Sequence, residues 1–216
     1  MTYLTQMTLN PARRAAGRLL GSPRAMHAAV LAGYAGDPGR ILWRVDRGER
    51  HEATLYVVGP VEPDLTHLVE QIGWPLTQTW RTTSYDPFLR RLGPGQSWHY
   101  RIMANPTYTT APGDGRRGTV RPHVTAGHQE QWLRQKAVGW GFAVADGGEG
   151  VLATRRSSDA FTKKDDETAR RVTLARVQLE GILTVQDADA LRAALVQGMG
   201  RAKAYGCGLM TLAPVG

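Results

Sequence analysis

One order of strands and helices occurs twice along the chain, and this repeat constrains the fold more than any other feature of the sequence. In the first half, alternating apolar residues predict strands over 3–9, 41–45 and 54–58, with a further extended stretch over 76–82. Composition and apolar spacing predict helices over 12–20, 24–34 and 64–72. The resulting order, β-α-β-β-α-β, is that of the ferredoxin-like unit.

The second half repeats this order. We expect strands over 97–104, 142–145, 151–154, 172–183 and 209–212, a long polar loop over 107–126, and helices over 128–140 and 187–197. Between the halves, residues 84–96 contain two prolines, two glycines and Arg90-Arg91, a composition that is typical of a linker. The sequence therefore predicts an α+β fold of two tandem ferredoxin-like domains, over 1–90 and 91–216.

Basic residues outnumber acidic ones in both halves. The chain has 27 Lys and Arg against 19 Asp and Glu, for a formal net charge of +8. Residues 1–108 carry 12 basic and 8 acidic side chains, and residues 109–216 carry 15 and 11. Because each phosphate that a cation neutralises releases counterions, this balance favours a polyanionic partner lying across both halves. Genome composition that enriches arginine and alanine would give the same excess.

Several classes of protein find no support in the sequence. The single cysteine, Cys207, excludes an internal disulfide framework. No run of about 18 apolar residues occurs, and the first residues lack a basic start followed by an apolar block. We therefore expect a cytoplasmic protein without a membrane partner. Metal-binding histidine motifs and the Gly-x-Ser-x-Gly motif are absent, so we expect neither a metal nor another cofactor.

A glycine-rich segment with two basic residues lies near the C-terminus. Its members are Gly198, Gly200, Arg201, Lys203, Gly206 and Gly208. Glycines allow a close approach of the backbone to a ligand, and the two cations add positive charge. An ordinary connection from a helix to a strand that needs positive φ angles would account for the same glycines.

Two basic pairs flank the polar segment 157–162, which has the length of a hairpin tip. These pairs are Arg155-Arg156 and Lys163-Lys164. Such a hairpin could follow the phosphates of an RNA. The acidic residues 165–167 come directly afterwards, so a solvated loop explains the segment equally well.

Four stretches occur in an order that runs through almost the whole chain. They are Leu9-Asn10-Pro11, Met26-His27, the segment 100–106 that ends in Asn-Pro, and the glycine-rich segment followed by Ala213-Pro214. In this combination the chain resembles the CasE family, the CRISPR-associated endoribonucleases of type I-E systems. The glycine-rich segment belongs to the wider repeat-associated RNA-binding superfamily, and the other stretches point to CasE.

The resemblance implies two ferredoxin-like domains, in agreement with the repeat. It also implies metal-independent cleavage of precursor CRISPR RNA at the base of the repeat stem-loop, by attack of a ribose 2′-OH that leaves a 2′,3′-cyclic phosphate and a 5′-OH. A protein of this family is further expected to retain the mature crRNA and to join other Cascade subunits. The alternative is a non-catalytic RNA-binding scaffold subunit of a ribonucleoprotein.

The resemblance also assigns roles to individual residues. His27 matches the catalytic histidine of the family, as general base or general acid; taken alone, a histidine at the rim of an apolar helix face is more often structural. Some relatives carry a tyrosine three residues earlier, where this chain has Arg24. We expect Arg24 to stabilise the charge of the phosphorane instead. The glycine-rich segment is then an RNA-backbone contact, and the two basic pairs contact the RNA duplex.

Overall fold

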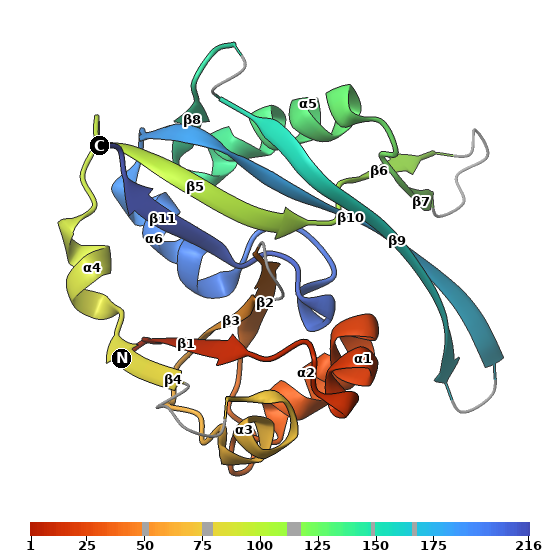
Figure 1. The fold of residues 1–216 in the computed structure, drawn as a ribbon. Coiled ribbons are helices and arrows are strands. Elements are labelled where there is room, and N and C mark those ends of the chain that lie inside the picture. The colour runs from red at the N-terminus through yellow and green to blue at the C-terminus, as the bar shows by residue number, and fades with distance from the viewer. Residues whose placement is uncertain (49–51, 75–79, 112–117, 148–149, 166–167) are drawn as a thin grey trace.

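The computed structural model describes residues 1–48, 52–74, 80–111, 118–147, 150–165 and 168–216, without the side chains of 159–165 and 168–173. Two antiparallel sheets, each covered by helices, lie one above the other (Figure 1). Residues 3–84 supply the first sheet and residues 97–214 the second. No helix in these ranges is long and apolar enough to cross a membrane.

The N-terminal sheet has the strand order β2-β3-β1-β4. Its elements are β1 (Tyr3–Leu9), α1 (Arg14–Gly21), α2 (Pro23–Leu31), β2 (Leu42–Arg47), β3 (Ala53–Gly59), α3 (Thr66–Ile72) and β4 (Trp80–Ser84). Strand β1 alternates as expected, since Thr5, Met7 and Leu9 are buried and the residues between them are exposed. The helices cover the apolar face that this alternation creates.

The C-terminal sheet has the order β11-β5-β10-β8, with β9 also paired to β10. Its elements are β5 (Ser97–Ala104), β6 (Thr107–Thr110), β7 (Thr119–Pro122), α5 (Ala126–Ala137), the 3-10 helix η1 (Val138–Trp140), β8 (Phe142–Val144), β9 (Leu152–Asp165), β10 (Thr168–Val185), α6 (Ala188–Gln197), the 3-10 helix η2 (Lys203–Tyr205) and β11 (Met210–Pro214). Both sheets place the four strands of a ferredoxin-like unit in the expected order, so the predicted fold class is confirmed.

Three sequence predictions need correction. The linker 84–96 contains a short helix, α4 (Asp86–Arg91), with a proline in its first turn. The expected loop 107–126 contains the two-stranded sheet of β6 and β7. The segment 157–162 is not a hairpin tip, because β9 runs on to Asp165 and pairs with β10 along its whole length. The division of the chain at residue 90 remains a prediction.

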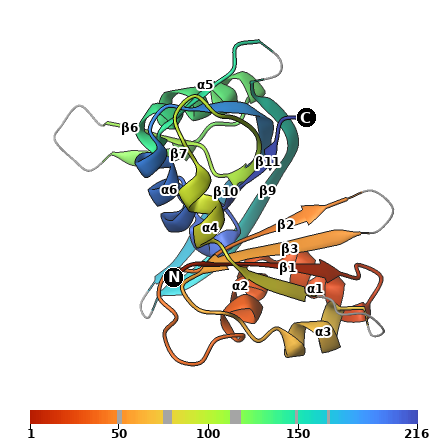
Figure 2. The ribbon, with the colours of Figure 1, turned by 90° about the vertical axis from the view of Figure 1, so that its left-hand side faces the viewer.

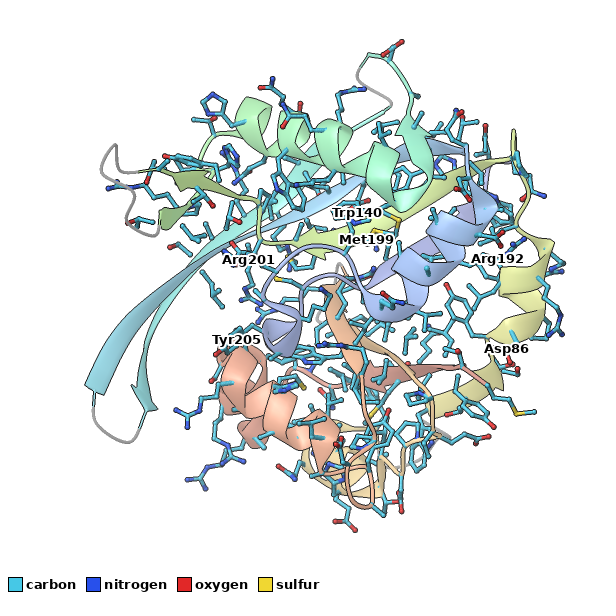
Figure 3. The ribbon with its side chains drawn as sticks, turned by 180° about the vertical axis from the view of Figure 1, so that it is seen from behind. Asp86, Trp140, Arg192, Met199, Arg201 and Tyr205 are labelled. Carbon is cyan, nitrogen blue, oxygen red and sulfur yellow. The ribbon has the colours of Figure 1, made fainter. Side chains whose placement is uncertain are left out.

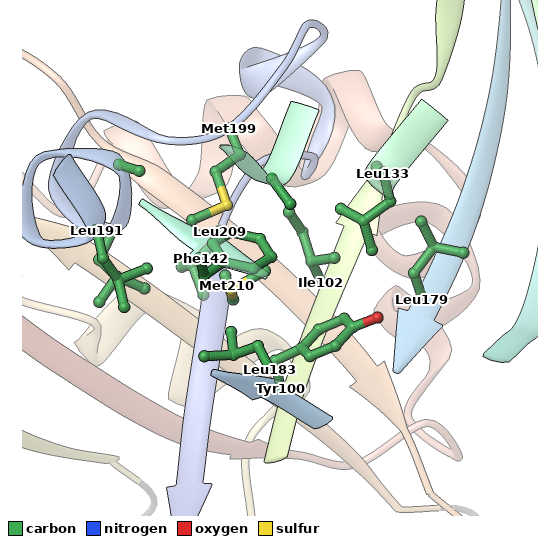
Figure 4. Packing of buried hydrophobic residues seen from close by; sticks show 14 of the residues in the cluster. Tyr100, Ile102, Leu133, Phe142, Leu179, Leu183, Leu191, Met199, Leu209 and Met210 are labelled. Atoms are coloured by element: carbon green, nitrogen blue, oxygen red, sulfur yellow. The ribbon is translucent and has the colours of Figure 1, made fainter. Parts of the chain in front are cut away.

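Each sheet has its own apolar core. The C-terminal core packs Tyr100, Ile102 and Leu179 of the sheet against residues of α5 and α6 such as Leu133 and Leu191 (Figure 4). The N-terminal core is formed by strand residues such as Met7 and Leu55 with residues of the three helices. The two cores meet at β2 and β3, because Leu42 and Val58 belong to the C-terminal core.

A buried arginine joins the two sheets. Arg44 of β2 is 1% exposed, and its guanidinium forms a two-point ion pair with Asp46 at 2.6 and 2.9 Å. The same guanidinium donates to the carbonyl oxygens of Arg101 and Leu209 at 2.6 and 3.0 Å, and to the Thr211 hydroxyl at 2.8 Å. Strands β5 and β11 of the C-terminal sheet are thus tied to β2 of the N-terminal sheet (Figure 2).

We expect Arg44→Met to lower the free energy of unfolding by about 3–5 kcal/mol, since in a buried site it removes the two-point partner of the Asp46 carboxylate and the donor to two carbonyl oxygens. Urea unfolding measures this loss. The control is Arg101→Met, because Arg101 also pairs with Asp46 but its side chain is 43% exposed. The control should cost about 1 kcal/mol or less, and equal losses would contradict the role assigned to Arg44.

Candidate functional site

A cleft of about 340 Å³ lies where the two sheets meet the base of the β9–β10 hairpin. Its walls come from α1, the start of α2, residues Trp43, Val45 and Arg47 of β2, and the first residues of the hairpin. The lining residues are Leu19, Leu20, Gly21, Pro23, Met26, Trp43, Val45, Arg47, Met103, Arg155, Arg156, Ser157, Arg176 and Gly206. Figure 1 shows the hairpin leaving the C-terminal sheet and passing beside the α1–α2 pair.

The cleft is positively charged. Among its described lining residues, four are arginines and none is acidic. Arg47 donates to the carbonyl oxygen of Leu20 at 2.9 Å, and Arg155 donates to the carbonyl oxygen of Arg47 at 3.4 Å. These contacts place guanidinium groups of both sheets around an apolar floor that includes Met26 and Trp43. A cavity with this chemistry suits an anion attached to a flat apolar group, as in a nucleotide.

Beside the cleft, His27 is held on α2. The helix begins with Ser22, whose hydroxyl accepts from the Ala25 amide at 3.2 Å, and Pro23 occupies its first turn. The imidazole is half-buried and lies nearly parallel to the Trp43 indole, with ring centroids 6.4 Å apart. Trp43 Nε1 donates to His27 Nδ1 at 3.1 Å. Burial lowers the pKa of His27 below its usual value.

Trp43 also connects His27 to the glycine-rich segment. Gly206 has a φ of +78°, and a Cβ added there would lie 2.8 Å from the Trp43 ring. Gly198 has a φ of +81°, and its added Cβ would lie 2.5 Å from Leu42. Glycine at these two positions therefore allows the segment to pack closely against β2. This supports the structural explanation of the glycines, a connection that needs positive φ angles.

The rest of the segment folds back on itself. Met199 donates to the carbonyl oxygen of Gly208 at 2.9 Å, and Lys203 Nζ donates to that of Gly200 at 2.6 Å. Burial lowers the pKa of the Lys203 ammonium, and the positive charge of Arg40 lowers it further. Arg201 is exposed, and Figure 3 shows it farther from α1 and α2 than Tyr205, which lies next to these helices.

The structure brings only part of the predicted set together. Arg155, Arg156 and Gly206 line the cleft, and His27 contacts its wall through Trp43. Arg24 is exposed on α2 and has no hydrogen bond or ion pair with any described residue. Lys163 and Lys164 lie far along β9, where their backbones pair with Arg170 and Ala169 of β10, and their side chains lie outside those described. These lysines are therefore separated from Arg155 and Arg156.

Sequence reasoning missed three residues of the site. Trp43 was one apolar residue in a predicted core strand, and nothing near it in the sequence marks it as the partner of His27. Arg47 ends β2, and its position next to the hairpin depends on how the two sheets pack. Arg176 of β10 pairs with Ser157 of β9. The sequence prediction placed a hairpin tip at 157–162 and therefore did not pair these two residues. No sequence signal would have found Trp43.

Residues 2–214 match the model of a family described as CRISPR associated protein. The chain is 30% identical to the CRISPR-associated endoribonuclease Cse3 of Thermus thermophilus, over 98% of this chain and 100% of that protein. It belongs to the CasE family. The CRISPR system Cascade subunit CasE of Escherichia coli is 30% identical over 128 residues, or 56% of this chain and 60% of that protein.

A solved structure of this family contains RNA. The structure of CRISPR endoribonuclease Cse3 bound to a 19-nucleotide RNA superposes on this chain with a TM-score of 0.80, 30% identity, and coverage of 98% of this chain and 100% of that one. The fold built here from two ferredoxin-like units is therefore the fold of a protein that binds RNA. Within the described residues, no group of three or more His, Cys, Asp or Glu side chains is placed to hold a metal ion.

We expect Gly206→Ala to destabilise the protein by about 2–4 kcal/mol, because a Cβ there is strained at positive φ and overlaps the Trp43 ring. The free energy of unfolding in urea measures the effect. Gly127→Ala is the matched control, since Gly127 lies on α5 with no atom within 4 Å of an added Cβ. Its stability should stay within about 1 kcal/mol of wild type. A harmless Gly206→Ala would refute the packing role of this glycine.

Proposed function

We propose that this chain is the endoribonuclease that cleaves precursor CRISPR RNA at the base of the repeat stem-loop, and that it keeps the mature crRNA as a subunit of Cascade. One observation carries the proposal. A chain 30% identical along its length to a CRISPR endoribonuclease has an arginine-lined cleft, and the cleft wall contains the hydrogen-bond partner of His27. The curated relative that is named a Cascade subunit supports the assembly.

In the proposed reaction the RNA supplies its own nucleophile. The ribose 2′-oxygen attacks the adjacent phosphorus and gives up its proton, the bond from phosphorus to the 5′-oxygen breaks, and that oxygen takes up a proton. The products are a 2′,3′-cyclic phosphate and a 5′-hydroxyl. The protein has to provide a proton acceptor, a donor to the oxygen that becomes negative, and positive charge near the phosphorane. No metal ion is needed to generate this nucleophile, so we propose that cleavage is metal-independent.

The described residues divide these tasks. His27 is the proposed catalytic residue, held at a fixed orientation by α2 and Trp43. Arg47 and Arg155 are within reach of a phosphate bound in the cleft, because both lie on its wall. Arg24 lies three residues before His27 on α2 and is exposed, which leaves it able to turn toward a bound phosphate. We propose that it stabilises the phosphorane charge.

The hairpin extends the site along the RNA. Strands β9 and β10 pair from Ser157–Arg176 outward to Asp165–Thr168, beyond the part of β10 that pairs with β5. At 3.3 Å per residue, this free two-stranded ribbon is roughly 30 Å long. Arg155 and Arg156 lie at its base, and Lys163 and Lys164 lie toward its tip. We propose that the ribbon follows the phosphates of the repeat stem, while the glycine-rich segment with Arg201 contacts the RNA backbone near the cleft.

The decisive experiment is a single-turnover cleavage assay in EDTA with a repeat hairpin from the organism's own CRISPR array. We expect wild type to cut once at the base of the stem. His27→Ala should lower the rate by at least a hundredfold, the usual contribution of one acid–base group. A substrate with a 2′-deoxyribose at the cleavage site should bind and remain intact. Arg24→Ala should cleave more slowly than wild type, and a wild-type rate would remove Arg24 from the mechanism.

The other results of this assay have clear meanings. Binding without cleavage by wild type would favour the non-catalytic scaffold. Cleavage that stops in EDTA and returns with Mg²⁺ would overturn metal independence while leaving the endoribonuclease in place. No binding of the hairpin would overturn the proposed substrate.

We also expect the double variant Arg155→Gln/Arg156→Gln to bind the repeat hairpin more weakly and with less dependence on salt. If both arginines contact phosphates, the slope of log K against log salt should decrease by about 1–2. Arg81→Gln is the control, because Arg81 is exposed on β4, at the opposite edge of the N-terminal sheet from β2 and the cleft. An unchanged slope in the double variant would remove these arginines from the RNA contact.

A further inference from the structure

We propose that Trp43 is a positioning residue for His27: its indole N–H holds the imidazole in the tautomer that carries its proton on Nε2. The inference rests on the proposed function, since it concerns how His27 takes part in that cleavage. It bears on a point that the sequence leaves open, namely whether the histidine acts as general base or as general acid.

The Trp43 indole fixes the direction of this hydrogen bond. An indole nitrogen has a proton and no lone pair to offer, so it can only donate a hydrogen bond. Trp43 Nε1 lies 3.1 Å from His27 Nδ1, and therefore Nδ1 must be the acceptor. A neutral imidazole carries one proton on one of its two nitrogens. With the lone pair of Nδ1 engaged by Trp43, that proton resides on Nε2.

The donor is held in place from several sides. Trp43 is 3% exposed and is the second residue of β2. The adjoining Arg44 is fixed by five hydrogen bonds, so the strand cannot shift freely at this point. Gly206 packs against the indole, and its lack of a side chain leaves the room that the ring occupies. The hydrogen bond is therefore formed before any RNA arrives, which is the meaning of preorganisation.

This tautomer restricts what His27 can do. A general base acting at Nε2 would need its lone pair there, and in the held tautomer Nε2 carries the proton. Protonation of Nδ1 would place two N–H donors against each other at 3.1 Å, so the Trp43 contact also disfavours the imidazolium. His27 is then a hydrogen-bond donor through Nε2, directed at an oxygen on which negative charge develops during cleavage. The proton of the 2′-OH then passes to solvent water, and the departing 5′-oxygen takes up its proton from water.

The test combines a spectrum with a rate. In protein labelled with ¹⁵N-histidine, long-range ¹H–¹⁵N correlation spectra distinguish protonated from unprotonated ring nitrogens. For wild type we expect His27 to show an unprotonated Nδ1 and a protonated Nε2. Trp43→Phe keeps an aromatic ring on β2 and removes the N–H donor, together with part of the ring area that packs on Gly206. The ¹⁵N chemical shifts of the two ring nitrogens of His27 should then move toward the averaged values of a mixture of tautomers. The single-turnover rate should decrease about tenfold, the effect expected for one hydrogen bond.

Trp98→Phe is the matched control. Trp98 is a half-buried tryptophan of β5 whose indole N–H donates to Gln96 at 3.3 Å, away from α2. This variant also loses one indole hydrogen bond, and it should leave both the His27 spectrum and the cleavage rate as in wild type.

A protonated Nδ1 in wild type would overturn the proposal. So would a Trp43→Phe protein whose spectrum and rate both match wild type. The wild-type spectrum decides the tautomer even if Trp43→Phe does not fold. It also separates this inference from the proposed function, because a chain that never cleaves RNA can still show or lack the Nε2–H tautomer.

Discussion

The candidate site depends on the ion pair and the hydrogen bonds of the buried Arg44 guanidinium. It pairs with Asp46 on its own strand, donates to two backbone carbonyls and a hydroxyl of the C-terminal sheet, and lies 5.2 Å from the centre of the Tyr56 ring. A charge this deeply buried is tolerated only when its donors are used, and here all three nitrogens have partners. Any sliding of one sheet over the other would leave some of these nitrogens without a hydrogen-bond partner. The relative position of the two sheets is therefore well defined.

The relative position of the two sheets affects the site through β2, whose successive side chains point to opposite faces. Leu42, Arg44 and Asp46 share one face of the strand, where they meet Gly198 and the C-terminal sheet. Trp43 and Arg47 share the opposite face, where they meet His27, Gly206 and the cleft. One strand thus holds the two sheets together and carries Trp43, the hydrogen-bond donor to His27. The candidate site therefore lies where the two sheets meet, with residues from both.

Sequence patterns predicted the elements well and their distant contacts poorly. Strand alternation in 3–9 is a local signal, and so are Ser22 and Asp187, whose side chains accept hydrogen bonds at the starts of α2 and α6. The β9–β10 hairpin was underestimated because the polar residues 155–167 lack apolar alternation, so they looked like a loop. His27 could be named from the family resemblance. Its partner Trp43 could not, since their contact joins a helix to a strand of the packed sheet.

Burial divides the site into two parts with different physical behaviour. The His27–Trp43 pair is shielded, so its hydrogen bond acts in a medium of low polarity and is little affected by dissolved salt. The arginines at the base of the hairpin are exposed, and their attraction to phosphates is strong only when many of them act together and salt is low. In the proposed function, the RNA is therefore held by many weak, exchangeable contacts spread along the ribbon. Only a few fixed atoms would then have to meet the bond that breaks, and the hydrogen bond between Trp43 and His27 is formed before any RNA binds.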